Sequence, residues 1–340
     1  MISNNQSSVM THNFNHFGIV GSGAWGTALA LTLARAGHKV TLWAHEAGLV
    51  ATINEKREND LYLKGVKLGT AIKATSDFAD LASCSAWILA TPAQHTREIA
   101  KRLAAHAKKQ PIIIATKGIE QNSSLLISDV VTSEIPGCAI AVLSGPSFAI
   151  EIARSLPAAL TLAIEDKMLG ENLTKAMATP AFRLYLTNDV KGAQIGGAVK
   201  NVLAVACGIV AGRQLGENAR AALITRGLAE MTRLGTALGG RIETLMGLSG
   251  LGDLVLTCSS SQSRNMSLGV ALGQGRALKE ILAERISVTE GIYTASAAAT
   301  LAKKHKVDMP IVAAVDAVLS GHADIESAIA GLLARPLKDE

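Results

Sequence analysis

Two lysines stand in sequence contexts where an amine could take part in catalysis. Lys200 lies between the apolar runs 195–199 and 202–206, so the segment around it is expected to be buried. Burial lowers the pKa of a lysine toward the range useful for proton transfer, which makes Lys200 a candidate general base. A lysine that reaches solvent from the edge of a helix–helix contact would fit the same pattern.

Lys117 follows the apolar run 112–115 and precedes Gly118. Its amine could therefore lie at a cleft at the end of a strand. A fixed positive charge there can stabilise the negative charge that develops on a substrate. A solvent-facing loop lysine is the alternative.

Residues that could assist these lysines follow later in the chain. Asp253 comes after the glycine-rich turn 247–252 and could pair with Lys200. Ser263, Arg264 and Asn265 stand at the expected start of a helix and offer the donors that a phosphate monoester needs. A serine-rich loop with an ordinary helix cap is the alternative. The turn 144–148, which includes Gly145 and Ser147, could present hydroxyl and N–H groups to a ligand.

The glycine-rich segment 21–26 directly follows an expected strand and opens an expected helix. Gly21, Gly23 and Gly26 would permit a tight turn, close approach of a pyrophosphate to backbone N–H groups and close helix packing. An ordinary glycine-rich turn is the alternative. The order of strand, motif, helix and second strand favours dinucleotide binding.

The end of the second strand indicates which dinucleotide is used. An acid there would bind the adenosine ribose of NAD and repel the 2′-phosphate of NADP, but this chain has Trp43, Ala44, His45 and then Glu46. His45 could donate to a ribose hydroxyl or to a 2′-phosphate, or be a plain loop histidine. We therefore expect NADP to be accepted and NAD not to be excluded.

These residues need elements that bring them together. Strands are expected at Phe17–Val20, Lys39–Trp43, Ala86–Ala90, Ile112–Ala115, Ala139–Leu143 and Leu160–Ile164. Helical periodicity lies between them at Thr27–Ala36, His95–Ala107 and Leu125–Thr132. Ala- and Leu-rich helical segments without strands follow at 191–213, 217–238, 263–273, 276–284, 291–304 and 309–319.

The pattern predicts a disordered tail at 1–13, a Rossmann-type α/β domain with a mostly parallel sheet at 14–190, and an all-helical substrate-binding domain at 191–335. Two domains also agree with a length of 340 residues and a hydrophobic content of 49%.

Charge and composition exclude several classes of function. The net charge is +5, but Lys and Arg are interleaved with Asp and Glu, so we expect anionic small substrates and no nucleic-acid partner. The four cysteines lack metal-binding spacing, so no metal is expected. Residues 1–13 lack the apolar core of a secretory signal, and the longest apolar stretch, Val202–Gly212, is too short to span a bilayer. We expect a cytoplasmic protein without stable membrane insertion.

From about residue 14 to 332, the chain resembles the bacterial NAD(P)-dependent glycerol-3-phosphate dehydrogenases. The resemblance rests on the segments 21–27, 116–118, 144–147, 199–201, 216–230, 252–253, 263–265 and 288–291. It implies reversible hydride transfer between NAD(P)H and dihydroxyacetone phosphate to give glycerol 3-phosphate. It also implies a homodimer and a role in phospholipid synthesis.

The resemblance also implies roles for individual residues. Lys200 would be the proton acceptor, Lys117 would stabilise the alkoxide, and Asp253 would orient Lys200. The substrate would be bound by Lys117, Gly145, Ser147, Lys200, Asn201, Asp253, Ser263, Arg264 and Asn265. The cofactor would be contacted by Gly21, Gly23, Ala24, Trp25, Gly26, His45, Pro92, Lys117, Ala149, Arg264, Val288 and Glu290. Ala24 departs from the serine often found in relatives, which puts one hydroxyl contact to the cofactor in doubt.

Two other functions are compatible with parts of this pattern. A β-hydroxyacid or 6-phosphogluconate-type dehydrogenase also combines a Rossmann half with a helical half and a lysine. Those enzymes are expected to have a K-x-x-x-N pattern on one helix face. In this chain the residue four positions after Lys200 is Ala204 and not Asn, which counts against this alternative. A non-catalytic NADP(H) sensor would not need Lys117, Lys200, Asp253 and Arg264 together.

Overall fold

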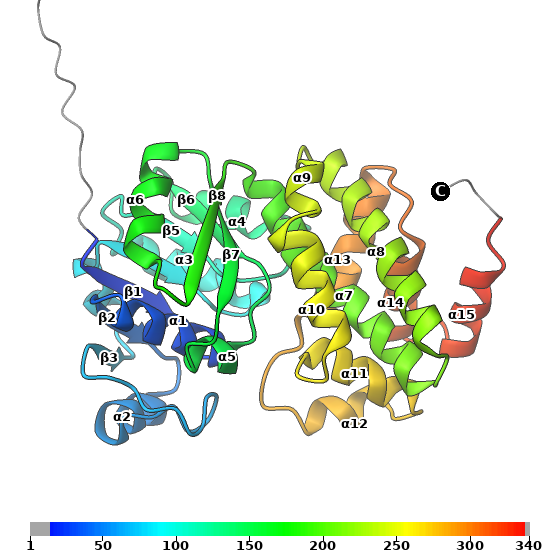
Figure 1. Cartoon of the computed structure of the whole chain (residues 1–340), viewed down its shortest axis with the longest axis horizontal. Coiled ribbons are helices and arrows are strands. Elements are labelled where there is room, and N and C mark those ends of the chain that lie inside the picture. The colour runs from blue at the N-terminus through cyan, green and yellow to red at the C-terminus, as the bar shows by residue number, and fades with distance from the viewer. Residues whose placement is uncertain (1–13, 337–340) are drawn as a thin grey trace, which may run out of the picture.

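The computed structural model describes residues 14–336, so the tail predicted at 1–13 lies outside the described residues. Two halves stand side by side, a sheet with helices against it and a bundle of helices (Figure 1). The last strand ends at Thr187 and the first helix of the bundle begins at Val190. The predicted fold class, an α/β half followed by a helical half, is confirmed.

The sheet has eight strands in the order β3-β2-β1-β4-β5-β6-β7-β8. All neighbouring strands are parallel except β6 and β7, so the prediction of a mostly parallel sheet is confirmed. The bounds are β1 His16–Val20, β2 Lys39–Trp43, β3 Ile72–Thr75, β4 Ala86–Leu89, β5 Ile112–Ile114, β6 Ile140–Ser144, β7 Ala158–Ile164 and β8 Phe182–Thr187.

The two strands that the sequence did not predict are the two edge strands, β3 and β8. An edge strand is covered less than a central one, so its sequence need not be a continuous apolar run. Lys73 in β3 and Arg183 in β8 are exposed, and both interrupt the pattern that marks the central strands.

Helices bury one apolar cluster on each face of the sheet. One cluster is packed by α1 (Ala24–Arg35), α2 (Ala47–Lys56), α5 (Ala149–Ala153) and α6 (Lys167–Met177). The other is packed by α3 (Thr96–Ala104), α4 (Ile127–Glu134) and the turn η1 (Phe78–Ser83). The three predicted helices are confirmed with shifted ends, and α2, α5 and α6 are additional.

The six helical segments predicted for the second half correspond to α7 (Val190–Gly212), α8 (Glu217–Ala237), α11 (Arg264–Gly273), α12 (Leu278–Ala283), α13 (Glu290–Lys304) and α14 (Pro310–Leu319). The structure adds α9 (Ile242–Leu245), the short π-helix η3 (Leu248–Gly252), α10 (Asp253–Ser259) and α15 (Ile325–Leu333). Asp253 is therefore the first residue of a helix that follows the glycine-rich turn.

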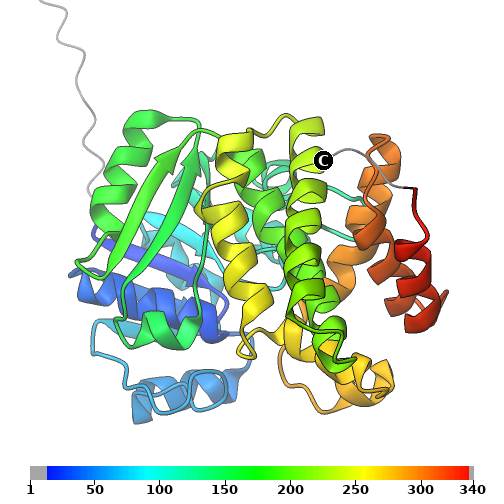
Figure 2. The same ribbon diagram turned by 45° about the vertical axis from the view of Figure 1, so that its right-hand side comes forward.

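α7 is the core helix of this half and joins it to the sheet. It packs against α8, α10, α11 and α13 and also contacts β6 (Figures 1 and 2). Glycine allows the close contact with α11, because a Cβ on Gly208 would lie 2.1 Å from the carbonyl oxygen of Met266. The contact brings Asn201 on α7 within hydrogen-bond distance of Asn265 on α11.

α7 is also long and apolar enough, by length and composition, to cross a membrane. The stretch 202–212, which was expected to be too short, is only part of a helix of 23 residues. However, 89% of its most apolar window is buried inside the structure, as in the core helix of a folded domain.

Candidate active site

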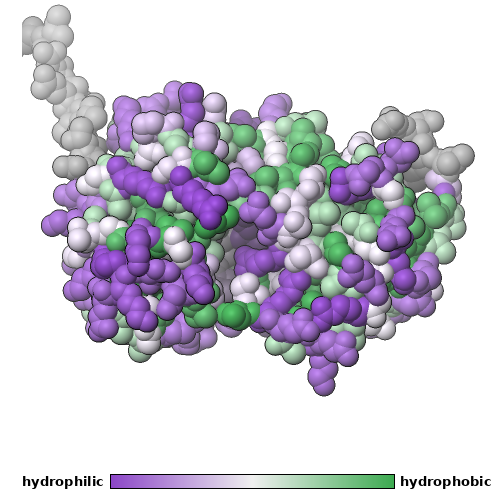
Figure 3. All heavy atoms as spheres, turned by 60° about the horizontal axis from the view of Figure 1, so that its bottom comes forward, coloured by the Kyte–Doolittle hydropathy of each residue, from purple (hydrophilic) through white to green (hydrophobic). Residues whose placement is uncertain are grey.

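A cleft of about 840 Å³ lies between the two halves. In Figure 3 the lower side of Figure 1 is turned toward the viewer, and the cleft is visible as a hollow. Its walls come from the carboxyl ends of central strands and from α7, α10, α11 and the start of α13, which is where an open α/β sheet binds its ligands. The predicted residues that line it are Gly21, Gly23, Ala24, Trp25, His45, Pro92, Lys117, Ser147, Ala149, Lys200, Asn201, Asp253, Ser263, Arg264, Asn265, Val288 and Glu290.

The two remaining predicted residues, Gly26 and Gly145, support the wall without lining it. A Cβ on Gly26 would lie 1.8 Å from the carbonyl oxygen of Gly21, so only glycine allows the turn to close against α1. The carbonyl oxygen of Gly145 accepts a hydrogen bond from Nζ of Lys117 at 2.8 Å.

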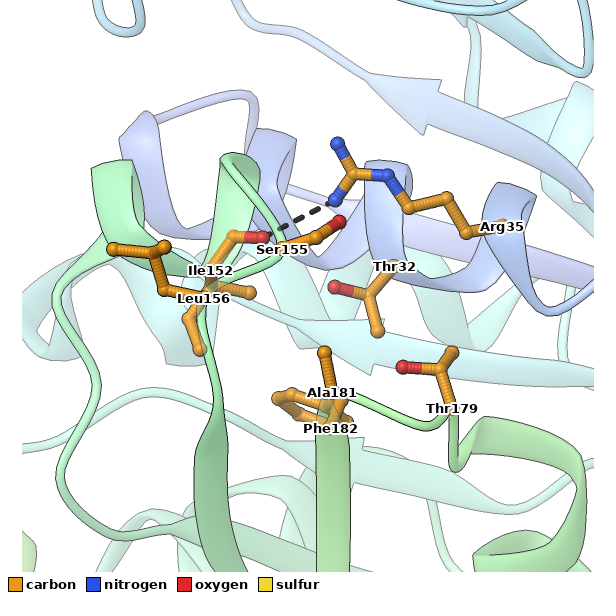
Figure 4. Close-up of a pocket in the computed structure, with 8 residues that line it drawn as sticks. All are labelled: Thr32, Arg35, Ile152, Ser155, Leu156, Thr179, Ala181 and Phe182. Atoms are coloured by element: carbon orange, nitrogen blue, oxygen red, sulfur yellow. Dashed lines mark hydrogen bonds between the residues drawn. The ribbon is translucent and has the colours of Figure 1, made fainter.

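A second cavity lies between α1, α5 and the start of β8 (Figure 4). Arg35 reaches across it and donates to the carbonyl oxygen of Ile152 at 3.2 Å. Its volume of about 10 Å³ leaves room for about one water molecule. This cavity cannot hold a substrate.

The glycine-rich segment fits a pyrophosphate. Gly21 has φ +113°, and a Cβ there would lie 2.7 Å from the carbonyl oxygen of Ala90. A Cβ on Gly23 would meet nothing within 4 Å, so the space above this residue is open. No side chain caps the N-terminus of α1, which leaves its first N–H groups available to an anion.

Two buried polar atoms in the cleft wall also lack a protein partner. They are Nε1 of Trp25 and Oε2 of Glu290. Oε1 of Glu290 accepts a hydrogen bond from the backbone N–H of Ala93 at 2.9 Å, and burial raises the pKa of this carboxyl to about 7. Unpartnered buried donors and acceptors of this kind are what a polar ligand would satisfy, so the wall fits a nicotinamide dinucleotide.

One carboxylate binds both candidate lysines. Nζ of Lys200 lies 2.6 Å from Oδ1 of Asp253, and Nζ of Lys117 lies 2.7 Å from Oδ2. The side chain of Asp253 is 1% exposed, compared with 9% for Lys200 and 15% for Lys117. The predicted pairing of Asp253 with Lys200 is present, and the second pairing was not predicted.

Burial lowers the pKa of Lys200 and so makes its neutral form more accessible. Desolvation is the largest cause and lowers its pKa to about 8, opposed by the charge of Asp253 and assisted by the charge of Lys117. Near neutral pH this amine can therefore exchange a proton, as a general acid–base catalyst must.

Thr257 is a site residue that the sequence did not reveal. Its Oγ1 accepts a hydrogen bond from Nζ of Lys200 at 2.9 Å and donates to the carbonyl oxygen of Asp253 at 2.6 Å. Asp253 and Thr257 are four residues apart on α10 and so share one helix face. That spacing would have revealed Thr257 if the segment had been assigned to a helix.

The three polar residues at the start of α11 differ in the hydrogen bonds that they already form within the protein. Oγ of Ser263 accepts from the N–H of Met266 at 3.2 Å, so Ser263 is the helix cap considered above. Asn265 accepts from the N–H of Gly291 at 2.9 Å and donates to Oδ1 of Asn201 at 2.9 Å. The guanidinium of Arg264 lines the cleft and donates to the carbonyl oxygen of Val288 at 2.8 Å.

These contacts extend to the loop that carries Lys117. Nδ2 of Asn201 donates to the carbonyl oxygen of Lys117 at 3.1 Å. Asn201 and Asn265 therefore connect the start of α13 with the end of β5 through α7 and α11. Nδ2 of Asn201 donates its second hydrogen to the carbonyl oxygen of Gly197 at 3.4 Å, whereas Nδ2 of Asn265 keeps one N–H for a ligand, because each Nδ2 carries two hydrogens.

Two family models cover most of the chain. The N-terminal model of NAD-dependent glycerol-3-phosphate dehydrogenase matches residues 16–170, and the C-terminal model matches residues 189–330. This chain belongs to the NAD-dependent glycerol-3-phosphate dehydrogenase family. The predicted resemblance is therefore confirmed.

Individual relatives of this dehydrogenase family match over their full length. Glycerol-3-phosphate dehydrogenase [NAD(P)+] of Caulobacter vibrioides is 56% identical over 96% of this chain and 99% of its own length. The protein of the same name from Parvibaculum lavamentivorans is 52% identical over 97% of this chain and 100% of its own length. The crystal structure of glycerol-3-phosphate dehydrogenase from Coxiella burnetii has a TM-score of 0.91 at 40% identity, covering 95% of this chain and 99% of that one.

Membership of the glycerol-3-phosphate dehydrogenase family confirms that the chain is an NAD(P)-dependent oxidoreductase. The non-catalytic sensor and the β-hydroxyacid-type dehydrogenase are therefore set aside. Within residues 14–336, no group of three or more His, Cys, Asp or Glu side chains could hold a metal ion.

Proposed function

We propose that the chain interconverts dihydroxyacetone phosphate and sn-glycerol 3-phosphate with NADP(H) or NAD(H). The observation that carries this proposal is the carboxylate of Asp253, which binds Lys200 and Lys117 in one cleft with the donors of α11. Two lysines at one end of the substrate and an arginine at the other suit a molecule with a reducible carbonyl and a phosphate.

Lys200 is the proposed acid–base group. When its amine is neutral, the two N–H bonds can be directed at Asp253 and Thr257, which leaves the lone pair for the proton of the C2 hydroxyl. In the reverse direction, the protonated amine donates to the oxygen at C2. The nicotinamide supplies or accepts the hydride at C2 when it is bound.

Asp253 and Lys117 set the charge around that oxygen. With Lys200 neutral, the charges of Lys117 and Asp253 balance, and protonation of Lys200 makes the group positive by one unit. Lys117 is proposed to stabilise the negative charge that develops on the C2 oxygen. The carbonyl oxygen of Gly145 and the hydroxyl of Ser147, 2.8 and 3.3 Å from its Nζ, hold the amine in place.

The phosphate is proposed to bind at the start of α11. Arg264 supplies the charged donor, and Ser263, Asn265 and Asn201 surround it. Binding at this remote group would orient C2 and hold it in place for reaction.

The cofactor is proposed to lie along the other wall of the cleft. Its pyrophosphate would meet the glycine-rich turn and the start of α1, where the methyl of Ala24 offers no hydroxyl. The remaining contacts are proposed for Trp25, His45, Pro92, Lys117, Ala149, Arg264, Val288 and Glu290.

Finer features of the protein are also proposed. They are a substrate-binding domain at 191–335 after a cofactor-binding domain at 14–190, a homodimer, a cytoplasmic location without stable membrane insertion, and a supply of glycerol 3-phosphate to phospholipid synthesis. The change from β8 to α7 near residue 190 supports the domain boundary, and the burial of α7 supports the absence of insertion.

The test is oxidation of NADPH and of NADH with dihydroxyacetone phosphate, unphosphorylated dihydroxyacetone, ketopantoate or succinic semialdehyde as the second substrate. Only dihydroxyacetone phosphate should be reduced efficiently, because binding energy from its phosphate orients the carbonyl. Comparable kcat/KM for dihydroxyacetone would contradict the phosphate site, and efficient reduction of either control acid would contradict the proposed substrate.

A further inference from the structure

An aromatic stack at the end of β2 carries an arginine. Trp43, the last residue of β2, stacks on Phe78 of η1 with ring centroids 4.5 Å apart and planes inclined by 15°. Cζ of Arg102 on α3 lies 4.6 Å from the centroid of the Phe78 ring. Phe78 therefore connects Trp43 at the end of the strand with a guanidinium on a neighbouring helix.

The two rings form a fixed support. Trp43 is 3% exposed and Phe78 is 5% exposed, and both belong to the apolar cluster on that face of the sheet. Nε1 of Trp43 donates to the carbonyl oxygen of Ser76 at 3.0 Å, which fixes the orientation of the indole. Arg102 is exposed on this support.

The guanidinium of Arg102 is left free for a ligand. Contact through its face with an aromatic ring leaves the N–H donors at its edge available, and these donors match a phosphate. Within residues 14–336, none of the ion pairs engages Arg102, although Arg97 on the same helix pairs with Glu120 and Glu134.

The position of Arg102 assigns it to the adenosine end of the cleft. Arg102 lines the same cleft as Trp43, His45 and Lys64. In a Rossmann-type sheet, the end of the second strand meets the adenosine ribose, and an acid there selects against a 2′-phosphate. Here that strand ends in Trp43, so this position has an aromatic support for a guanidinium where NAD-specific folds have a carboxylate.

Two carboxylates also face this end of the cleft, Glu46 and Glu98. Oε1 of Glu46 accepts a hydrogen bond from the hydroxyl of Tyr62 at 3.0 Å, and neither carboxylate forms an ion pair with Arg102. Glu98 lies one helical turn before Arg102 on α3 but does not pair with it, so in the described structure the edge of the guanidinium is open to an anion that a ligand brings.

We propose that Arg102, held on the Phe78–Trp43 stack, binds the 2′-phosphate of NADP and is a specificity-determining residue of this enzyme. The proposal rests on the proposed function and deepens it by naming the group that recognises the cofactor's distinguishing phosphate. Arg102 acts alongside His45, whose ring centroid lies 6.2 Å from that of Trp43.

The test compares two probes that differ only in the 2′-phosphate, adenosine 2′,5′-bisphosphate and adenosine 5′-monophosphate, by titration calorimetry on the full chain. The wild type should bind the bisphosphate more tightly. Arg102→Gln should weaken bisphosphate binding by about tenfold to a hundredfold, as expected for loss of a charge-assisted contact, and should change monophosphate binding by less than about twofold.

Lys101→Gln is the matched control, because Lys101 is exposed on α3 beside Arg102 but does not line the cleft. It removes the same unit of charge and should leave both affinities unchanged. Arg102→Lys should lose part of the affinity for the bisphosphate, since it keeps the charge but not the planar fork.

Several outcomes would overturn the proposal. Unchanged bisphosphate binding in Arg102→Gln would show that the guanidinium does not meet the phosphate. Equal weakening of the binding of both probes in Arg102→Gln would mean that the guanidinium stacks on the adenine instead. Equal effects of Lys101→Gln and Arg102→Gln on bisphosphate binding would mean that Arg102 contributes only through its positive charge and not through a direct contact. NADH-dependent reduction of dihydroxyacetone phosphate, measured on the same variants, tests the proposed function separately because NADH lacks the 2′-phosphate.

Discussion

Nζ of Lys200 on α7 lies 2.6 Å from Oδ1 of Asp253 on α10, and the other oxygen of that carboxylate is 2.7 Å from Nζ of Lys117. A buried carboxylate shared by two amines acts on both, because its removal would leave two positive charges close together in a poorly solvated site. The activity of each lysine should therefore depend on Asp253.

Asp253→Asn should reduce kcat by about a hundredfold or more, because the amide neither balances the charges nor holds both amines. Lys200→Met combined with Asp253→Asn should be far less than additive if the two residues act as one unit. Single-turnover rates would measure this. Glu243→Gln, at an exposed acid on α9, is the control and should leave the rate unchanged, whereas full additivity in the double variant would argue for independent roles.

The rate should depend on pH in opposite senses in the two directions. Desolvation lowers the pKa of Lys200 to about 8, so the amine is mostly protonated below that pH and mostly neutral above it. Oxidation of glycerol 3-phosphate needs the neutral base and should rise tenfold per pH unit toward a plateau above about pH 8. Reduction needs the protonated form and should decline above the same pH.

This pH dependence can be measured as kcat/KM between about pH 6.5 and 9.5, above the second ionisation of the substrate phosphate near pH 6. Asp253→Asn should move the inflection to lower pH, because the carboxylate raises the pKa of Lys200. An inflection that moves upward, or profiles of the same sense in both directions, would be incompatible with Lys200 as the titrating group.

His45→Asp should shift cofactor preference toward NADH. His45 is exposed in the cleft wall just beyond β2, and an acid there would accept from the ribose hydroxyls and repel a 2′-phosphate. The ratio of kcat/KM for NADPH to that for NADH should fall by about tenfold or more. An unchanged ratio would refute the assignment of His45 to the adenosine end.

Much of this site could be predicted because local sequence determined it. The apolar residues on both sides of Lys200 indicated its burial, and the glycines at 21–26 indicated the dinucleotide turn. The pairing of Lys117 with Asp253 could not be predicted, because these residues are 136 positions apart and meet only when the fold brings the loop after β5 to the start of α10. Local patterns do not report contacts of that range.

Other features were missed because a local pattern was ambiguous. Thr257 was hidden because the polar stretch after it resembles a loop, although the residue lies on α10. The edge strands β3 and β8 were missed because exposed residues interrupt their apolar runs. Arg102 and Phe78 belong to separate elements, and only the fold shows that the guanidinium lies on the ring.

We propose that Lys200 transfers the proton, and hydride transfer in Lys200→Met tests this role. The substitution keeps the length and apolar stem of the side chain and removes the amine, so NADPH binding, followed by fluorescence, should remain close to that of the wild type. The single-turnover rate with dihydroxyacetone phosphate should fall by at least about a hundredfold, the lower range of general acid–base contributions. Hydride transfer at the wild-type rate in Lys200→Met would contradict this role of Lys200 and make Lys117 the next candidate.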